Sequence, residues 1–179
     1  MLFRSAAREG LTNTSFRVMN AESLEFDDSR FDVVFGIGIL HHLDLDRAYS
    51  EIARVLNPNG VAVFLEPLGH NPFINLARRM TPKSRTADEH PMLTKDLRLL
   101  SGYFSDVDIS YVNFTTLALA PFGWIPGAQF LVPALRSVDR ALFRVAPFSR
   151  RFAWNAVLQL RRPKSRIVKS GTGQLAEHP

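Results

Sequence analysis

One segment, residues 31–67, constrains the fold of this chain more than any other because its strand and helix patterns alternate with little ambiguity. The apolar run 33–35 predicts a parallel strand that is buried on both faces. The glycines of 36–38 then loosen the chain at the carboxyl end of that strand, where open doubly wound sheets bind their ligands. The run 61–65 predicts a second buried strand, which brings Glu66 to the same edge. The segment is therefore half of a nucleotide-type binding fold.

An amphipathic helix is predicted between those two strands. Apolar residues recur on one side of residues 48–56, and charged residues take the other side. The sequence 57–60 ends the helix, because Pro58 cannot continue it and Gly60 is expected to take a left-handed turn.

These patterns resemble the middle of a class I S-adenosylmethionine-dependent methyltransferase, in particular the type-11 branch of that family. Several motifs occur in order at the family's spacing: Phe31-Asp32-Val33-Val34, Leu40-His41-His42-Leu43, Glu51-Ile52-Ala53-Arg54-Val55-Leu56-Asn57-Pro58-Asn59-Gly60 and Glu66-Pro67. Residues 15–24 resemble the preceding strand and its adenine-side loop. The resemblance extends from about residue 10 to residue 114 and, less closely, over 152–163.

The resemblance implies an α/β, Rossmann-like sheet with the strand order 3-2-1-4-5-7-6 and a helical insertion before the last strand. It also implies which residues contact S-adenosylmethionine. Asn20 and Ala21 follow the third family strand, and Gly36, Ile37 and Gly38 follow the fourth. Asn20 replaces the aspartate that is common there, although an amide oxygen can still accept a hydrogen bond from the adenine amino group.

Two family features are not found in the sequence: the Gly-rich loop after the first strand, and the acidic residue that ends the second. Residues 6–11 already resemble the end of the helix that follows the second strand. We therefore expect residues 1–163 to be a methyltransferase domain that lacks its first two strands, with residues 1–5 not necessarily native. Such a chain is expected to be inactive alone, and its unpaired strand edges favour aggregation or assembly with another chain.

The family's chemistry moves a methyl group from a sulfonium to an oxygen, nitrogen or carbon nucleophile, and a base can assist when the nucleophile is a hydroxyl. His41 and His42 are the first candidates for that base. Because the pair is a family signature found with many acceptors, at least one of the two is expected to be structural. Glu66, His70 and Asn71 follow the next strand, and they either face the acceptor or cap the next helix.

A polar cluster follows in residues 78–90, where Arg79, Arg85 and His90 are candidate acceptor contacts. Three roles are open for this cluster: it lines an acceptor pocket, it binds an anionic group, or its charges pair with one another on the surface. The third role is slightly favoured. No metal site is predicted, since adjacent histidines are poor co-ligands.

The region 115–149 is the least generic part of the chain. Residues 115–135 carry no charge, but three prolines argue against a membrane-spanning helix. Arg136, Arg140 and Arg144 then recur every fourth residue beside an apolar stripe. The pattern favours a helical layer packed on the sheet, or an apolar substrate lid that also contacts a membrane surface.

The chain has a net charge of +5, and its basic residues concentrate in 136–169, which hold ten Arg or Lys and one Asp. Nucleic-acid binding is not favoured, because no such motif accompanies the charges. Residues 164–179 are predicted to be a disordered basic tail. The absence of cysteine excludes disulfides and fits a cytoplasmic protein, with membrane-peripheral contact as an option.

The function that these observations favour is methyl transfer, preferably to oxygen, on a small-molecule or lipid-like acceptor. A degenerate methyltransferase-like module, which binds a partner or a membrane without catalysis, is the alternative. A Gly-rich loop encoded upstream would favour the enzyme, and a true start at Met1 would favour the module.

Overall fold

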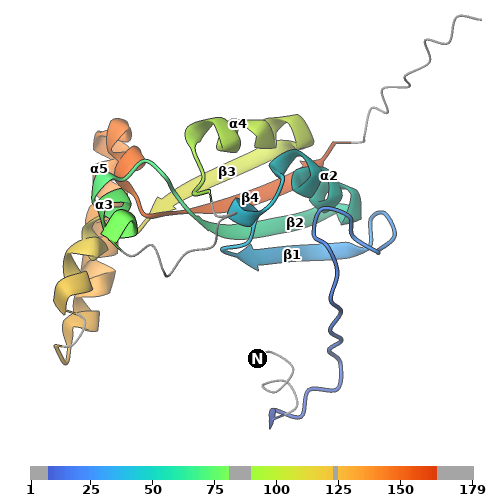
Figure 1. Ribbon diagram of the computed structural model, residues 1–179, viewed down its shortest axis with the longest axis horizontal. Coiled ribbons are helices and arrows are strands. Elements are labelled where there is room, and N and C mark those ends of the chain that lie inside the picture. The colour runs from blue at the N-terminus through green and yellow to red at the C-terminus, as the bar shows by residue number, and fades with distance from the viewer. Residues whose placement is uncertain (1–7, 81–89, 123–124, 165–179) are drawn as a thin grey trace, which may run out of the picture.

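The computed structural model describes residues 8–80, 90–122 and 125–164. Four strands form one sheet in the order β1-β2-β4-β3 (Figure 1). The strands are β1 (Phe31–Ile37), β2 (Leu56–Pro67), β3 (Phe104–Val112) and β4 (Asn155–Pro163). β1 and β2 are parallel, whereas β4 is antiparallel to both of its neighbours. This order matches the 4-5-7-6 half of the expected sheet, so the predicted fold class is confirmed.

Two helices cover one face of the sheet, and the remaining helical segments lie beyond the carboxyl ends of β1, β2 and β3 (Figure 1). The covering helices are α2 (Leu45–Val55) and α4 (Thr94–Tyr103). The others are α3 (Pro72–Met80), α5 (Val132–Val145) and the 3₁₀ helices η1 (Leu40–His42), η3 (Thr115–Phe122), η4 (Ala128–Leu131) and η5 (Pro147–Phe152).

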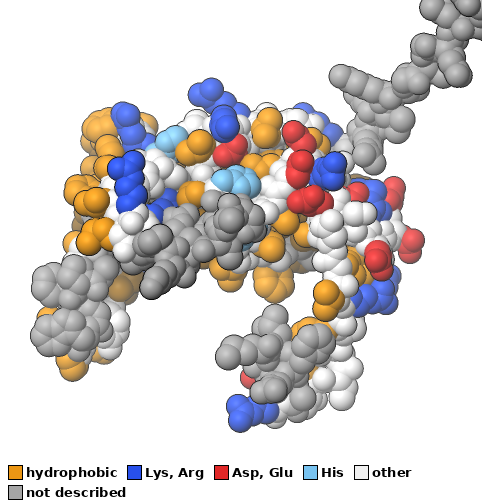
Figure 2. Space-filling view, in the orientation of Figure 1, with side chains coloured by type: hydrophobic (Ala, Val, Ile, Leu, Met, Phe, Trp, Pro, Cys, Tyr) orange, Lys and Arg blue, Asp and Glu red, His pale blue; other side chains and the backbone are white. Residues whose placement is uncertain are grey.

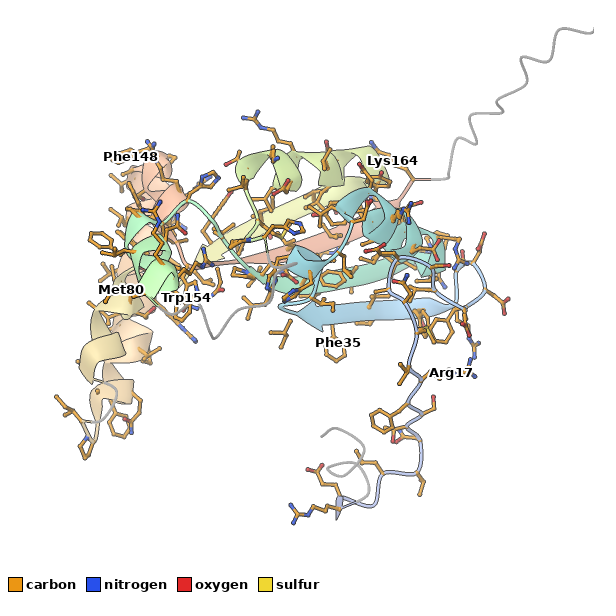
Figure 3. All side chains as sticks on the ribbon, in the orientation of Figure 1. Arg17, Phe35, Met80, Phe148, Trp154 and Lys164 are labelled. Atoms are coloured by element: carbon orange, nitrogen blue, oxygen red, sulfur yellow. The ribbon has the colours of Figure 1, made fainter. Side chains whose placement is uncertain are left out.

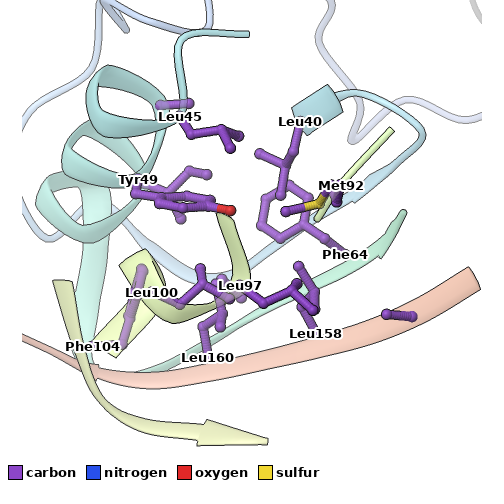
Figure 4. Packing of buried hydrophobic residues seen from close by; sticks show 14 of the residues in the cluster. Leu40, Leu45, Tyr49, Phe64, Met92, Leu97, Leu100, Phe104, Leu158 and Leu160 are labelled. Carbon is purple, nitrogen blue, oxygen red and sulfur yellow. The ribbon is translucent and has the colours of Figure 1, made fainter. Parts of the chain in front are cut away.

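The core lies between the sheet and the layer of α2 and α4 (Figure 4). Alternate residues of the central strands point into it, including Phe64 of β2 and its partner Leu158 of β4. Tyr49 of α2 and Leu100 of α4 pack there and are completely buried. Burial of each such side chain contributes about 1.5–3 kcal/mol, so this layer is the main source of stability.

The opposite face of β1 is open, and here the prediction of a strand buried on both faces is wrong. Val33, Phe35 and Ile37 are 58%, 77% and 73% exposed. β1 is an edge strand, and Figure 3 shows Phe35 projecting away from the α2 and α4 layer. Among the described residues no helix packs on this face, so the apolar side chains remain uncovered.

Two local predictions also differ from the structure. Residues 15–24 do not form a strand, because no strand of the described chain pairs with them. Gly60 is not left-handed; a Cβ atom there would lie 2.8 Å from the Asp32 carbonyl oxygen, so close packing requires the glycine.

Several predictions concern residues outside the described ranges. They include the candidate contact Arg85, residues 1–5, the first two residues of the helix end at 6–11 and the tail after Lys164.

Candidate active site

Glu66 joins the carboxyl ends of β1 and β2. Its side chain is completely buried at the end of β2, and Oε1 accepts hydrogen bonds from the backbone N–H groups of Ile39 and Leu40, both at 3.0 Å. Oε2 lies 2.8 Å from Nδ1 of His41 and 3.4 Å from the His41 backbone nitrogen. We call Glu66, Ile39, Leu40 and His41 the Glu66 cluster. It fixes the turn that follows β1.

The Glu66 cluster determines how the His41 imidazole is presented. Nδ1 is engaged by the carboxylate, so Nε2 is the ring nitrogen left for other chemistry. Cε1 lies 3.5 Å from the position that a Cβ atom of Gly38 would occupy, so the ring borders the glycine turn. The His42 ring packs 4.1 Å from it, centroid to centroid, and the backbone of His90 donates to the His41 carbonyl oxygen at 2.9 Å.

The glycine turn lies at the same edge. Gly38 has a φ of +59°, a left-handed conformation that favours glycine, and its N–H donates to the Leu65 carbonyl at 2.9 Å. Gly36 is the next-to-last residue of β1, and Ile37 ends the strand with its side chain exposed. All three predicted cofactor contacts on this strand are therefore at its carboxyl end.

The loop with the other two predicted cofactor contacts is tied to the same edge. Oδ1 of Asn20 accepts from the Glu22 N–H at 2.9 Å, and Ala21 lies between these two residues. Glu22 Oε1 in turn accepts from the backbone N–H of Asp44, which caps the start of α2, at 2.9 Å. The structure thus brings Asn20 and Ala21 toward the end of the sheet that carries the Gly38 turn.

Arg54 of α2 holds the loop that leads into β1. Its guanidinium donates to the carbonyl oxygens of Leu24 and Phe26 at 2.9 and 2.7 Å and to Asp28 Oδ1 at 2.8 Å. It also forms two hydrogen bonds with Glu51. The hydrogen bonds to Glu51, and to a smaller extent the one to Asp28, raise the pKa of Arg54. Sequence reasoning had assigned Arg54 only to the polar side of the helix.

The predicted acceptor contacts after β2 have local partners. The Asn71 side chain is buried; Oδ1 accepts from the Phe73 and Ile74 N–H groups at 2.9 and 3.2 Å, and Nδ2 donates to the Phe152 carbonyl. His70 Nε2 accepts the backbone N–H of Thr94 at 3.0 Å. For Asn71 the structure shows the capping alternative, whereas His70 binds the first residue of α4 instead of the next helix. Contact of either residue with an acceptor stays a prediction.

The remaining candidates are dispersed. Arg79 is exposed on α3, whereas His90 is joined to the site through its backbone. In the described part of the chain, no group of three or more His, Asp or Glu side chains is arranged to hold a metal ion.

The sequence and the fold of this chain are similar to those of known methyltransferases. A family model described as a methyltransferase domain matches residues 2–64. This match covers about a third of the chain, and it includes β1, η1 and α2. A demethylmenaquinone methyltransferase of Chlorobaculum tepidum is 40% identical over 63 residues, which make up 35% of this chain and 26% of the relative. The ubiquinone/menaquinone biosynthesis C-methyltransferase UbiE of Shewanella halifaxensis is 25% identical over 123 residues, 59% of this chain and 49% of that one. The chain thus spans less than half the length of either methyltransferase.

A solved structure shares the fold of this chain. Phosphoethanolamine N-methyltransferase 2 of Haemonchus contortus, in complex with phosphomonomethylethanolamine and S-adenosylhomocysteine, superposes with a TM-score of 0.56 at 14% identity. The match covers 90% of this chain and 40% of that enzyme.

The residues present fit one part of the methyltransferase cofactor. The left-handed Gly38 turn leaves the backbone open to close approach, and the Asn20 loop offers an amide at the same edge. The Gly-rich loop that the resemblance implies does not occur in the sequence. Contact of Asn20, Ala21 and the 36–38 turn with the cofactor stays a prediction.

Proposed function

We propose that this domain transfers a methyl group from S-adenosylmethionine to a small, apolar, lipid-like acceptor. The observation that carries the proposal is the Glu66 cluster, which fixes the turn after β1 at the edge where the Asn20 loop also lies. The family match and the relatives named above support the same reaction.

S-adenosylmethionine supplies a methyl group that its sulfonium has already activated. Asn20 and Ala21 would hold the adenine end of the cofactor, and the backbone of Gly36, Ile37 and Gly38 would border the rest. The main task of this chain's residues is to position the two reactants, because orientation provides much of the rate of such a transfer.

His41 is proposed to receive the proton that the acceptor loses. Glu66 acts as its positioning residue, since it engages Nδ1 and leaves Nε2 as the proton-accepting atom. Oxygen is the acceptor atom predicted from the sequence. The C-methyltransferase name of one relative supports carbon as the alternative, and either nucleophile loses a proton near the methyl group.

Exposed apolar side chains support a lipid-like acceptor. Phe73, Leu76 and Met80 of α3 are exposed, as is Phe130 of η4. Figure 2 shows hydrophobic side chains gathering, with Lys and Arg among them, at the end of the molecule that α3 and α5 form. We propose that residues 115–149 form a lid there and contact a membrane surface from the cytoplasm. Within the described ranges, no helix is both long and apolar enough to cross a bilayer.

The experiment measures transfer of radiolabelled methyl from S-adenosylmethionine to a demethylated naphthoquinone. It compares two forms of the protein: the 179-residue chain and the product of its full reading frame. Each form is tested as the wild type, as Glu66→Gln and as Glu25→Gln, the last being the matched control at an exposed position. Labelled product that depends on Glu66 but not on Glu25 supports the proposal. Lack of transfer by both forms, when both still sediment with phospholipid vesicles, favours the non-catalytic module.

A further inference from the structure

A groove with a volume of about 530 Å³ runs between β3 and α5. That volume is within the usual range for small-molecule sites. β3 contributes Ser110 and Tyr111 to its lining. The other side carries four guanidinium groups, from Arg136, Arg140 and Arg144 of α5, here called the α5 arginines, and Arg150 of η5.

The positive charge in this groove is not balanced. The α5 arginines recur at every fourth position, so they lie on one side of the helix, where like charges repel. The groove holds two carboxylates, Asp108 and Asp139. Asp139 is buried, and its two oxygens accept the backbone N–H groups of Phe114 and Thr115 at 3.0 and 2.8 Å. Among the described residues, the groove lining therefore carries four guanidinium groups and two carboxylates, and both oxygens of the Asp139 carboxylate are already engaged by backbone N–H groups.

Arg150 is held in place within the groove. Its guanidinium lies 5.9 Å from the centroid of the Tyr111 ring, and its Nε donates to the Phe143 carbonyl at 3.2 Å. These contacts leave both Nη groups available for another acceptor. A guanidinium that is already oriented loses less conformational entropy when it binds.

We infer that this groove binds the phosphate group of a phosphomonoester or diphosphate. Guanidinium groups match phosphate oxygens in geometry and form charge-assisted hydrogen bonds with them, and Ser110 adds a hydroxyl donor. The phosphate belongs either to a soluble compound or to a phospholipid headgroup.

A second, smaller hollow of about 200 Å³ shares Tyr111 and Arg150 with the groove and reaches Leu68 and His70, which follow β2. A bound phosphate would therefore lie beside the edge assigned to the acceptor. Only this last point rests on the proposed function; phosphate binding itself does not.

The test titrates the 179-residue chain with inorganic pyrophosphate by calorimetry, at an ionic strength held constant with KCl. The same proteins are sedimented with vesicles of phosphatidylcholine, with and without phosphatidic acid. The test variant is Arg140→Gln/Arg144→Gln. The control variant, Lys95→Gln/Arg98→Gln, removes the same amount of charge from two exposed positions of α4. All four side chains are exposed, so both variants should fold, which circular dichroism verifies.

We expect the Arg140/Arg144 variant to bind pyrophosphate at least about tenfold more weakly, and the α4 variant to change affinity by less than about twofold. Binding confined to phosphatidic acid vesicles, with the same dependence on Arg140 and Arg144, supports the site and identifies a lipid headgroup as the source. Equal losses in both variants would mean a diffuse charge effect and overturn the inference. Absence of binding to either probe would overturn it as well.

Discussion

Glu66 Oε2 lies 2.8 Å from His41 Nδ1, and both side chains are buried. The two residues come from motifs that stand 25 positions apart in the sequence, Leu-His-His-Leu after β1 and Glu-Pro at the end of β2. Their contact shows that the two motifs are halves of one structural unit. The carboxylate holds the backbone of the turn and orients the imidazole at the same time.

Replacing Glu66 by Gln should destabilise the chain by about 2–3 kcal/mol, because an amide offers one acceptor oxygen where the carboxylate offers two and leaves a buried N–H group without a partner. Urea unfolding followed by circular dichroism measures the effect. Glu25→Gln, at an exposed position, should change the free energy of unfolding by less than about 0.5 kcal/mol. Equal stabilities of the two variants would contradict the role assigned to Glu66.

Arg54→Lys should loosen the loop before β1, since an ammonium cannot reproduce the forked hydrogen bonds to Leu24, Phe26 and Asp28. We expect a loss of about 1–3 kcal/mol and faster hydrogen exchange of the Leu24 and Ser29 amides. Arg47→Lys, on an exposed part of the same helix, is the control. Unchanged exchange at both amides would show that the loop is held by other contacts.

Tyr49→Phe should leave stability unchanged or raise it by up to about 1 kcal/mol. The hydroxyl is buried without a hydrogen-bond partner among the described residues. Burial is the largest cause that raises the pKa of Tyr49, and the negative charges of Asp96, Glu66 and Asp46 raise it further. The folded chain therefore keeps the Tyr49 proton after the unfolded chain begins to lose it, near pH 10, so this group makes stability fall as the pH rises above about 10.

Unfolding curves measured between neutral pH and pH 11 check the alkaline effect. Tyr49→Phe should show a smaller alkaline loss of stability than the wild type. The same slope in both proteins would refute the assignment to Tyr49.

Phe35→Lys should reduce self-association, because Phe35 lies on the open face of edge strand β1. The side chain is mostly exposed, so the free energy of unfolding should change by less than about 0.5 kcal/mol. Sedimentation velocity compares this variant with Phe130→Lys, which removes an equally exposed ring from η4. If only Phe130→Lys lowers association, the contact lies in the 115–149 region instead.

Much of the sheet was predictable because its signals are local. The apolar runs of β1 and β2 and the stripe of α2 can each be recognised within about ten residues, and the family motifs supply the strand order. Burial was not predictable in the same way. Val33 and Phe35 have the composition of a doubly buried strand, yet one face of β1 remains open because burial depends on what packs against it.

The positions of the candidate site residues in the fold were predictable, but their contacts were not. The sequence placed Glu66 and Asn71 at the correct edge, but it could not distinguish a side chain that contacts a ligand from one that satisfies backbone N–H groups. The network of Arg54 was missed, since its partners lie in an irregular loop without periodicity. The spacing of the α5 arginines was visible, but their opposition to β3 required the structure.

Titration of the uniformly ¹⁵N-labelled chain with S-adenosylhomocysteine, followed by amide chemical shifts, tests the central claim most directly. The proposed cofactor contacts are the Asn20 loop and the turn after β1, and the 179-residue sequence holds no Gly-rich loop beside them, so we predict weak, fast-exchange binding. The shifts should concentrate at Asn20, Ala21 and the 36–38 turn and should shrink in Asn20→Ala. Shifts confined to other surfaces, or none at all, would contradict the claim that these residues form the cofactor edge.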